Sequence, residues 1–137
     1  KPPPSPELIS TVVKKMREYS SQDFGEQNSQ TIPIIYGGRS TPERTEAILA
    51  DQHVEGLILG SACNSIEKTL AIAHAMKEVM GDRRKILHAN FKAYILTSTY
   101  EEYIRELQKL DATYTIYLSP PAIDIAQVHQ LLENVTF

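Results

Sequence analysis

The sequence predicts an α/β fold in which helices cover a parallel sheet, and two observations support this prediction. Segments whose apolar residues recur at helical spacing alternate along the chain with four short apolar stretches. These stretches are apolar at most positions, as expected of strands that are buried on both faces. Five helices, four full strands and the start of a fifth strand are therefore expected.

The first elements are a helix, a loop, a strand and a second helix. Ser5 is a suitable N-cap before Pro6, and apolar residues recur at helical spacing over about residues 6–19. The polar residues 20–30 are typical of a loop. The apolar residues 32–36 then predict a strand that two glycines close, and Thr41 opens the second helix.

The remaining elements follow the same pattern. Residues 54–59 predict a second strand, and Asn64 with Glu67 predicts a capping box for a helix that ends at Gly81. Ser98 with Glu101 predicts the next helix start in the same way. Further strands are expected at residues 85–89 and 114–118, a last helix follows near residues 125–132, and residues 135–137 look like the start of another strand.

Composition excludes several classes of protein. The chain has 137 residues, enough for one domain, and a formal net charge of −3, which argues against a nucleic-acid binder. No apolar run approaches the roughly 20 residues that cross a membrane, and no signal-peptide core is visible. The lone Cys63 cannot form an internal disulfide. We therefore expect a cytoplasmic protein with no membrane partner.

The loops that follow the strands are the candidates for chemistry, because ligands of parallel α/β folds bind at the carboxyl ends of the strands. Gly37-Gly38-Arg39-Ser40 follows the first strand and Gly60-Ser61 the second, and both turns precede helix N-termini that could cradle a phosphate. Lys92 follows the third strand and could neutralise a phosphate or an oxyanion. A glycine placed only for its turn and a solvated lysine remain the alternative interpretations.

Three motifs together resemble the triosephosphate isomerase family. They are Tyr36-Gly37-Gly38, then Gly56-Leu57-Ile58-Leu59-Gly60-Ser61-Ala62, then Ala89-Asn90-Phe91-Lys92. In that family the first two belong to strands seven and eight of the (β/α)8 barrel and the third to strand one. The resemblance implies a circularly permuted chain in strand order seven, eight, one, two, with the start of three. Residues 1–81 then match the C-terminal part of the family fold and residues 85–137 the N-terminal part.

The resemblance also implies roles for individual residues. Lys92 matches the electrostatic lysine and Asn90 the asparagine that shapes the site, while Tyr36 matches a residue that holds the closed sixth loop. No cofactor and no metal are implied. The implied contacts to the substrate phosphate are Gly38, Arg39, Ser40, Gly60 and Ser61.

The chain departs from the family pattern at several positions. Arg39 stands where the family has serine, Ser61 replaces a glycine and Phe91 a tryptophan. Ala93-Tyr94 replaces Met-Asn, which leaves the wall beside the lysine undefined. The family's glutamate base and histidine electrophile belong to strands that have no counterpart here.

The four histidines do not fill that gap, since each is expected to be structural or solvated. They are His53, His74, His88 and His129.

A complete barrel takes about 250 residues, so this chain resembles a little over half of one. We expect a complementary chain to supply strands three to six, giving a hetero- or higher oligomer that interconverts dihydroxyacetone phosphate and glyceraldehyde 3-phosphate. One alternative is a non-catalytic half-barrel or flavodoxin-like module that binds phosphate or assembles. An engineered or cleaved half of a permuted enzyme is another.

Overall fold

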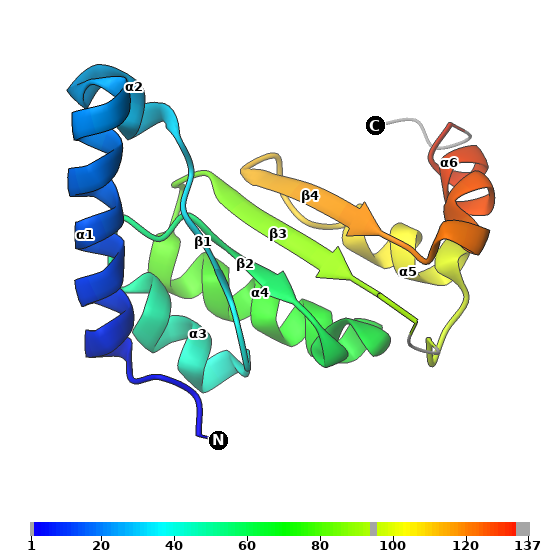
Figure 1. Ribbon diagram of the computed structural model, residues 1–137. Coiled ribbons are helices and arrows are strands. Elements are labelled where there is room, and N and C mark those ends of the chain that lie inside the picture. The colour runs from blue at the N-terminus through cyan, green and yellow to red at the C-terminus, as the bar shows by residue number, and fades with distance from the viewer. Residues whose placement is uncertain (1, 94–95, 134–137) are drawn as a thin grey trace.

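The computed structural model describes residues 2–93 and 96–133 of the chain. Within them the predicted α/β alternation is confirmed (Figure 1). The strands form one four-stranded parallel sheet in which chain neighbours are also neighbours in the sheet. The strand predicted at residues 135–137 lies outside the described residues. The observed strands are β1 (Ile35–Gly37), β2 (Gly56–Leu59), β3 (Lys85–Asn90) and β4 (Tyr114–Ser119).

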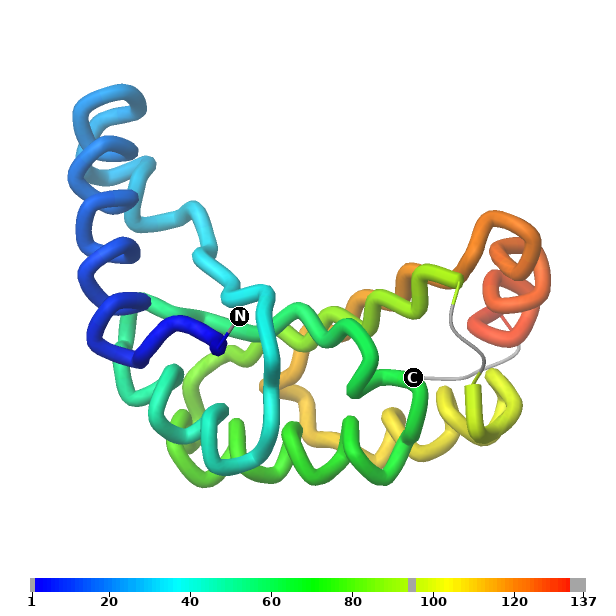
Figure 2. The backbone as a smooth tube through the Cα atoms, turned by 60° about the horizontal axis from the view of Figure 1, so that its bottom comes forward, coloured from blue at the N-terminus to red at the C-terminus, as the bar shows by residue number. Residues whose placement is uncertain are grey.

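The helices lie in an arc around one side of this sheet (Figure 2). Helices α3, α4 and α5 cover one face, and α1 and α6 stand at the two ends of the arc. No helix of the described residues covers the opposite face, which we call the open face. The helices are α1 (Pro6–Phe24), α2 (Glu26–Thr31), α3 (Pro42–Leu49), α4 (Ile66–Met80), α5 (Tyr100–Leu107) and α6 (Ile125–Glu133), with short 3₁₀ helices η1 (Ser61–Asn64) and η2 (Ala122–Asp124).

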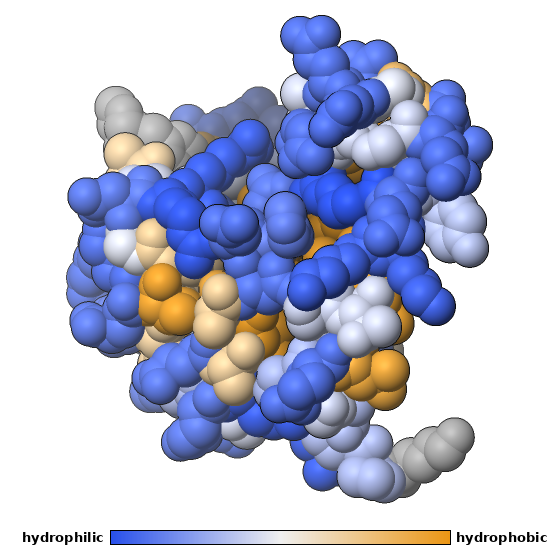
Figure 3. Space-filling model, turned by 90° about the vertical axis from the view of Figure 1, so that its left-hand side faces the viewer, coloured by the Kyte–Doolittle hydropathy of each residue, from blue (hydrophilic) through white to orange (hydrophobic). Residues whose placement is uncertain are grey.

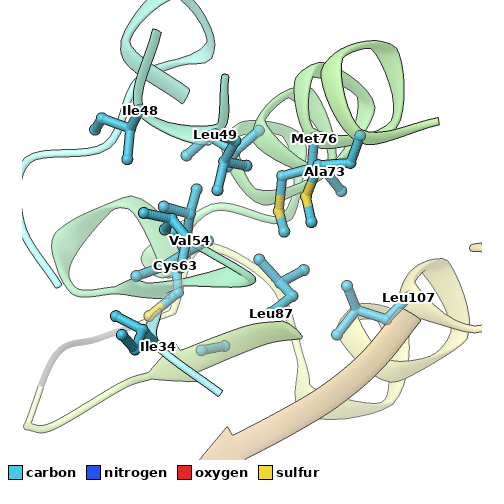
Figure 4. Packing of buried hydrophobic residues seen from close by; sticks show 14 of the residues in the cluster. Ile34, Ile48, Leu49, Val54, Cys63, Ala73, Met76, Leu87 and Leu107 are labelled. Carbon is cyan, nitrogen blue, oxygen red and sulfur yellow. The ribbon is translucent and has the colours of Figure 1, made fainter. Parts of the chain in front are cut away.

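The hydrophobic core fills the space between the sheet and its covering helices (Figure 4). Leu57 and Leu59 of β2 and Leu87 of β3 are fully buried there. They pack in one cluster with Leu49 of α3 and Met76 of α4. Because successive side chains of a strand point to opposite faces, the residues between them lie on the open face.

Register arranges the open face in rows, because paired residues of parallel strands share a face. The rows run across the sheet from edge to edge. The lower row is Ile35, Gly56, Ile86 and Thr115, the middle row is Gly37, Ile58, His88 and Tyr117, and the upper row includes Asn90 and Ser119.

The loop predicted at residues 20–30 is wrong, because helix α1 runs on to Phe24 and α2 follows it. Arg17 explains the second helix. Its Nη1 donates to the carbonyl oxygens of Ser29 and Ile32, both at 2.5 Å, and its Nη2 lies 2.9 Å from Glu55 Oε1. This polar segment is therefore fixed by contacts to a buried arginine, and apolar periodicity could not show it.

Two predicted helix starts are displaced by one residue. Ser65, and not Asn64, caps α4, since its Oγ accepts from the backbone N–H of Lys68. Likewise Thr99, and not Ser98, forms the capping box of α5, with Glu102. Adjacent polar residues fit the same capping pattern, so only the backbone geometry decides between them.

Lys85 fixes the junction between the two halves that the resemblance distinguishes. Its side chain is fully buried at the start of β3. Its Nζ donates to the carbonyl oxygens of Gly81 at 2.5 Å and Arg83 at 2.8 Å, and to Thr113 Oγ1 at 2.8 Å. The ammonium thus binds carbonyls after the end of α4 and ties them to the start of β4.

We predict that Lys85→Met lowers the free energy of unfolding of the chain by about 2–3 kcal/mol, because it leaves buried oxygens without their charged donor. Urea unfolding followed by circular dichroism measures this loss. Lys68→Met, at an exposed position of α4, is the matched control and should change stability by less than about 0.5 kcal/mol. Equal stability of both variants would contradict the proposed role of Lys85.

Gly56 sets the contact between β2 and β3, because a Cβ there would overlap the carbonyl oxygen of Ile86. We predict that Gly56→Ala destabilises the chain by about 3 kcal/mol, since backbone must move to admit the methyl group. Gly37→Ala is the control, because its Cβ would meet Ile58 Cβ at an ordinary 3.7 Å. The same unfolding measurement compares the two, and a milder effect at Gly56 would contradict the prediction.

Candidate functional site

The parallel sheet brings the loops of interest to one edge, where all four strands end. Gly38, Arg39 and Ser40 follow β1, Gly60 follows β2, and Asn90 is the last residue of β3. The sequence-predicted site residues therefore share one end of the sheet.

Lys92 and the turn after β2 lie in direct proximity. A Cβ placed on Gly60 would lie 4.0 Å from Lys92 Nζ, so the ammonium stands over this glycine. The charge of Lys92 also acts on Cys63 of η1, where it opposes the burial that raises the thiol pKa to about 11. The structure thus joins the candidate lysine to one of the two candidate phosphate turns.

The backbone at Lys92 is in the left-handed region, with φ 52°. This conformation is uncommon outside glycine and costs free energy, so the surrounding structure must hold it. The neighbouring residue Phe91 anchors this backbone, because its side chain is fully buried. Its ring packs edge-on to the rings of Tyr100 and Tyr103, at centroid distances of 5.6 and 5.2 Å. The N–H of Phe91 also donates to the carbonyl oxygen of Ser119 at 3.1 Å.

A second tether fixes the segment that follows Lys92. The backbone N–H and the Oγ1 of Thr97 both donate to the carbonyl oxygen of Asn64, at 2.9 and 3.0 Å. Asn64 ends η1, which begins directly after Gly60. The two hydrogen bonds from Thr97 therefore hold the segment that follows the lysine against the end of η1.

The turn after β1 is shaped by Tyr36 and Gly38. The Tyr36 hydroxyl lies so close to Gly38 that a Cβ there would overlap it. Arg44 of α3 braces the same turn, since its Nε donates to the carbonyl oxygen of Arg39 and its Nη2 to that of Pro4, both at 3.0 Å. The Arg39 residue itself is exposed. This turn stands one strand away from Lys92, on the far side of β2.

Sequence reasoning missed a polar pair on the open face. His88 Nε2 and Ser119 Oγ are 2.7 Å apart and form a hydrogen bond between β3 and β4. The His88 ring is also edge-on to Tyr117, with centroids 6.1 Å apart. The alternation of side chains along β3 could have indicated that His88 lies near the candidate site. His88 and Asn90 are two residues apart and therefore share a face of the sheet.

The described residues hold no group of three or more His, Cys, Asp or Glu side chains that could bind a metal ion. In the same part of the chain, no helix is long and apolar enough to cross a membrane.

A four-stranded parallel sheet with helices along one face, and the candidate turns at its carboxyl edge, is an α/β architecture consistent with part of a β/α barrel. A family model described as Triosephosphate isomerase matches residues 1–76, which include β1, β2 and both candidate phosphate turns. The chain therefore belongs to the triosephosphate isomerase family. No solved structure matches it.

Burial lowers the pKa of His88, so folding favours the neutral imidazole. Between the lowered pKa and the ordinary value of about 6.5 the unfolded chain binds more protons than the folded chain. We therefore predict that stability is full above this window and falls as the pH drops through it. His88→Gln should flatten this slope in urea unfolding measured across the pH range. An unchanged slope would contradict the assignment, and His129→Gln, at an exposed position, is the control.

Proposed function

We propose that this chain supplies the lysine and the phosphate-binding turns of a triosephosphate isomerase, which interconverts dihydroxyacetone phosphate and glyceraldehyde 3-phosphate. The observation that carries the proposal is the position of Lys92 Nζ over Gly60. It places a cation beside a turn of the kind that binds phosphate, at the carboxyl edge of a parallel sheet.

The chemistry of the reaction assigns a task to each group. The substrate phosphate would bind to backbone N–H groups of the turns at Gly38–Ser40 and at Gly60 and Ser61. Lys92 and Asn90 would face the carbonyl end, where negative charge develops on oxygen as the enediol forms. A fixed cation lowers the free energy of that transition state more than that of the neutral carbonyl.

Two further groups are needed that these residues do not supply. Triosephosphate isomerase is the type example of an enzyme that pairs a glutamate base with a neutral histidine electrophile. In the proposed barrel numbering, β1 to β4 are strands seven, eight, one and two, and the missing groups belong to strands six and four. A complementary segment, expected on a partner chain, would supply strands three to six.

The helices support a complement of this kind. In the described part of the chain, five helices other than α2 flank four strands, and α1 and α6 stand at the two ends. A barrel of eight strands and eight helices is then completed by four strands with three helices between them. Two copies of this chain would instead bring ten such helices to eight strands. Helix α1 of one copy and α6 of the other would compete for the same place.

Apolar side chains are exposed beside both edge strands of the sheet, where further strands and helices could pack. Leu8, Val12 and Met16 of α1 are about half exposed, at 54, 48 and 48%. They line a groove of about 310 Å³ between α1 and β1, and apolar patches interrupt the hydrophilic surface on this side (Figure 3). A second hollow of about 400 Å³ lies between α5, β4 and α6, with Leu118 and Leu132 in its wall. Covering these surfaces would stabilise the closed barrel.

The alternative function is a phosphate-binding or assembly module without catalysis. Arg39 favours it, because an exposed guanidinium stands where the family has a serine. Tyr94 also departs from the family pattern, but it lies outside the described residues. This alternative keeps phosphate binding by the turns and predicts no isomerase activity in any assembly.

The proposal is tested on the native particle, either this chain with its co-purifying partner or the longer protein if the remaining strands lie on the same polypeptide. We predict that Lys92→Ala lowers isomerase kcat by about 10²–10³-fold or more, because a fixed charge at the developing oxyanion is lost. A coupled assay measures turnover, and native mass measures assembly.

Lys68→Ala is the matched control, since this exposed lysine lies on α4 and should leave kcat unchanged. Full activity of Lys92→Ala would remove the lysine from the site. A stable monomeric particle that binds inorganic phosphate at the turns but never catalyses isomerisation would favour the alternative function.

A further inference from the structure

The pair formed by His88 and Ser119 has a defined place on the open face. Ser119 pairs with Asn90 in the register of β3 and β4, so the two side chains are neighbours in the upper row. His88 lies in the row beneath and reaches Ser119 diagonally, at 2.7 Å. The pair therefore adjoins the candidate residue Asn90 from below and from the side.

The pair lies where a small molecule can reach it. In its own row His88 is flanked by Ile58 of β2 and Tyr117 of β4, and Tyr117 is half exposed. His88 and Ser119 are themselves only partly buried. A hydrogen-bonded polar pair on the open face, beside the candidate residue Asn90, is therefore a candidate for function.

The hydrogen-bonding capacity of the pair leaves room for a ligand. A serine hydroxyl has one donor and two acceptor sites. If Ser119 donates to His88 Nε2, its oxygen can still accept from a substrate hydroxyl. If the His88 ring donates instead, the Ser119 hydroxyl can donate to a substrate oxygen. In either tautomer one further partner fits.

We propose that Ser119, held by His88, is a further contact for the hydroxycarbonyl end of a short phosphorylated substrate, beside Asn90. His88 is then a positioning residue, which acts through Ser119. The inference rests on the proposed function, because it takes the substrate end from it. It adds a binding group on β4 to the site that β1, β2 and β3 already form.

The test is a titration of the chain itself, followed by nuclear magnetic resonance of the His88 ring and of the Gly60 and Ser61 amides. Dihydroxyacetone phosphate should shift all three sets of signals, whereas inorganic phosphate should shift only the amides. Ser119→Ala should weaken dihydroxyacetone phosphate binding by about five- to tenfold, the loss of one hydrogen bond, and leave inorganic phosphate binding unchanged. Ser119→Thr, which keeps the hydroxyl, should restore most of the difference.

Two further variants separate positioning from folding. His88→Gln keeps a hydrogen-bonding side chain and should weaken binding less than His88→Leu, while His129→Gln on the surface should have no effect. In the assembled isomerase, Ser119→Ala should change KM and kcat while native mass stays the same.

Amide shifts from dihydroxyacetone phosphate without any response of the His88 ring would overturn the inference, as would equal binding by Ser119→Ala and the unchanged chain. The proposed function fails on a different result, the absence of isomerase activity in the native particle. If the His88 ring signals shift with dihydroxyacetone phosphate but the native particle has no isomerase activity, Ser119 is still a ligand contact, and the chain is then a binding module.

Discussion

The parallel pairing of β2 with β3 is the constraint on which the rest of the molecule depends. It joins residues before the Gly81–Arg84 junction to residues after it, and its register places the turn after β2 beside the loop after β3. Gly56 permits the close approach, and Lys85 binds the carbonyls of the junction. Without this pairing, Gly60 and Lys92 would belong to separate surfaces, and neither would form a site alone.

The same sheet has two edges at which further strands could pair. Each edge strand has a neighbour on one side only within the described sheet, and exposed backbone groups at such edges favour pairing with further strands. The arc of helices curves around one face, so strands added at both edges would meet over the open face (Figure 2). The rows of side chains on that face would then become interior layers, and His88 and Asn90 would be enclosed with them.

The sequence predicted the α/β class and its four strands because apolar periodicity and strand composition are local signals. It missed α2, since that helix depends on Arg17, a residue of another helix that binds its carbonyl oxygens. It also missed the hydrogen bond between His88 and Ser119, because the sequence of one strand does not determine its register with the next. The position of Lys92 and Gly60 at the carboxyl ends of strands placed both at one edge of the sheet, and the resemblance assigned them to one site. The left-handed backbone at Lys92 had no signal in the sequence.

Charge at the carboxyl edge explains how the proposed chemistry would be divided. The described site groups on β3 and β4 are cationic or neutral, with Lys92 as the cation and His88 held neutral by burial. The carboxylates that follow the phosphate turns, Glu43 and Glu67, are engaged at helix starts, where hydrogen bonds lower their pKa and weaken them as bases. These groups could bind an anion and stabilise an oxyanion, but neither of the two carboxylates is a suitable base to remove a proton from carbon. Closing the barrel would therefore do two things at once. It would deliver the base, and it would exclude water from Lys92, which strengthens the electrostatic interaction on which the lysine acts.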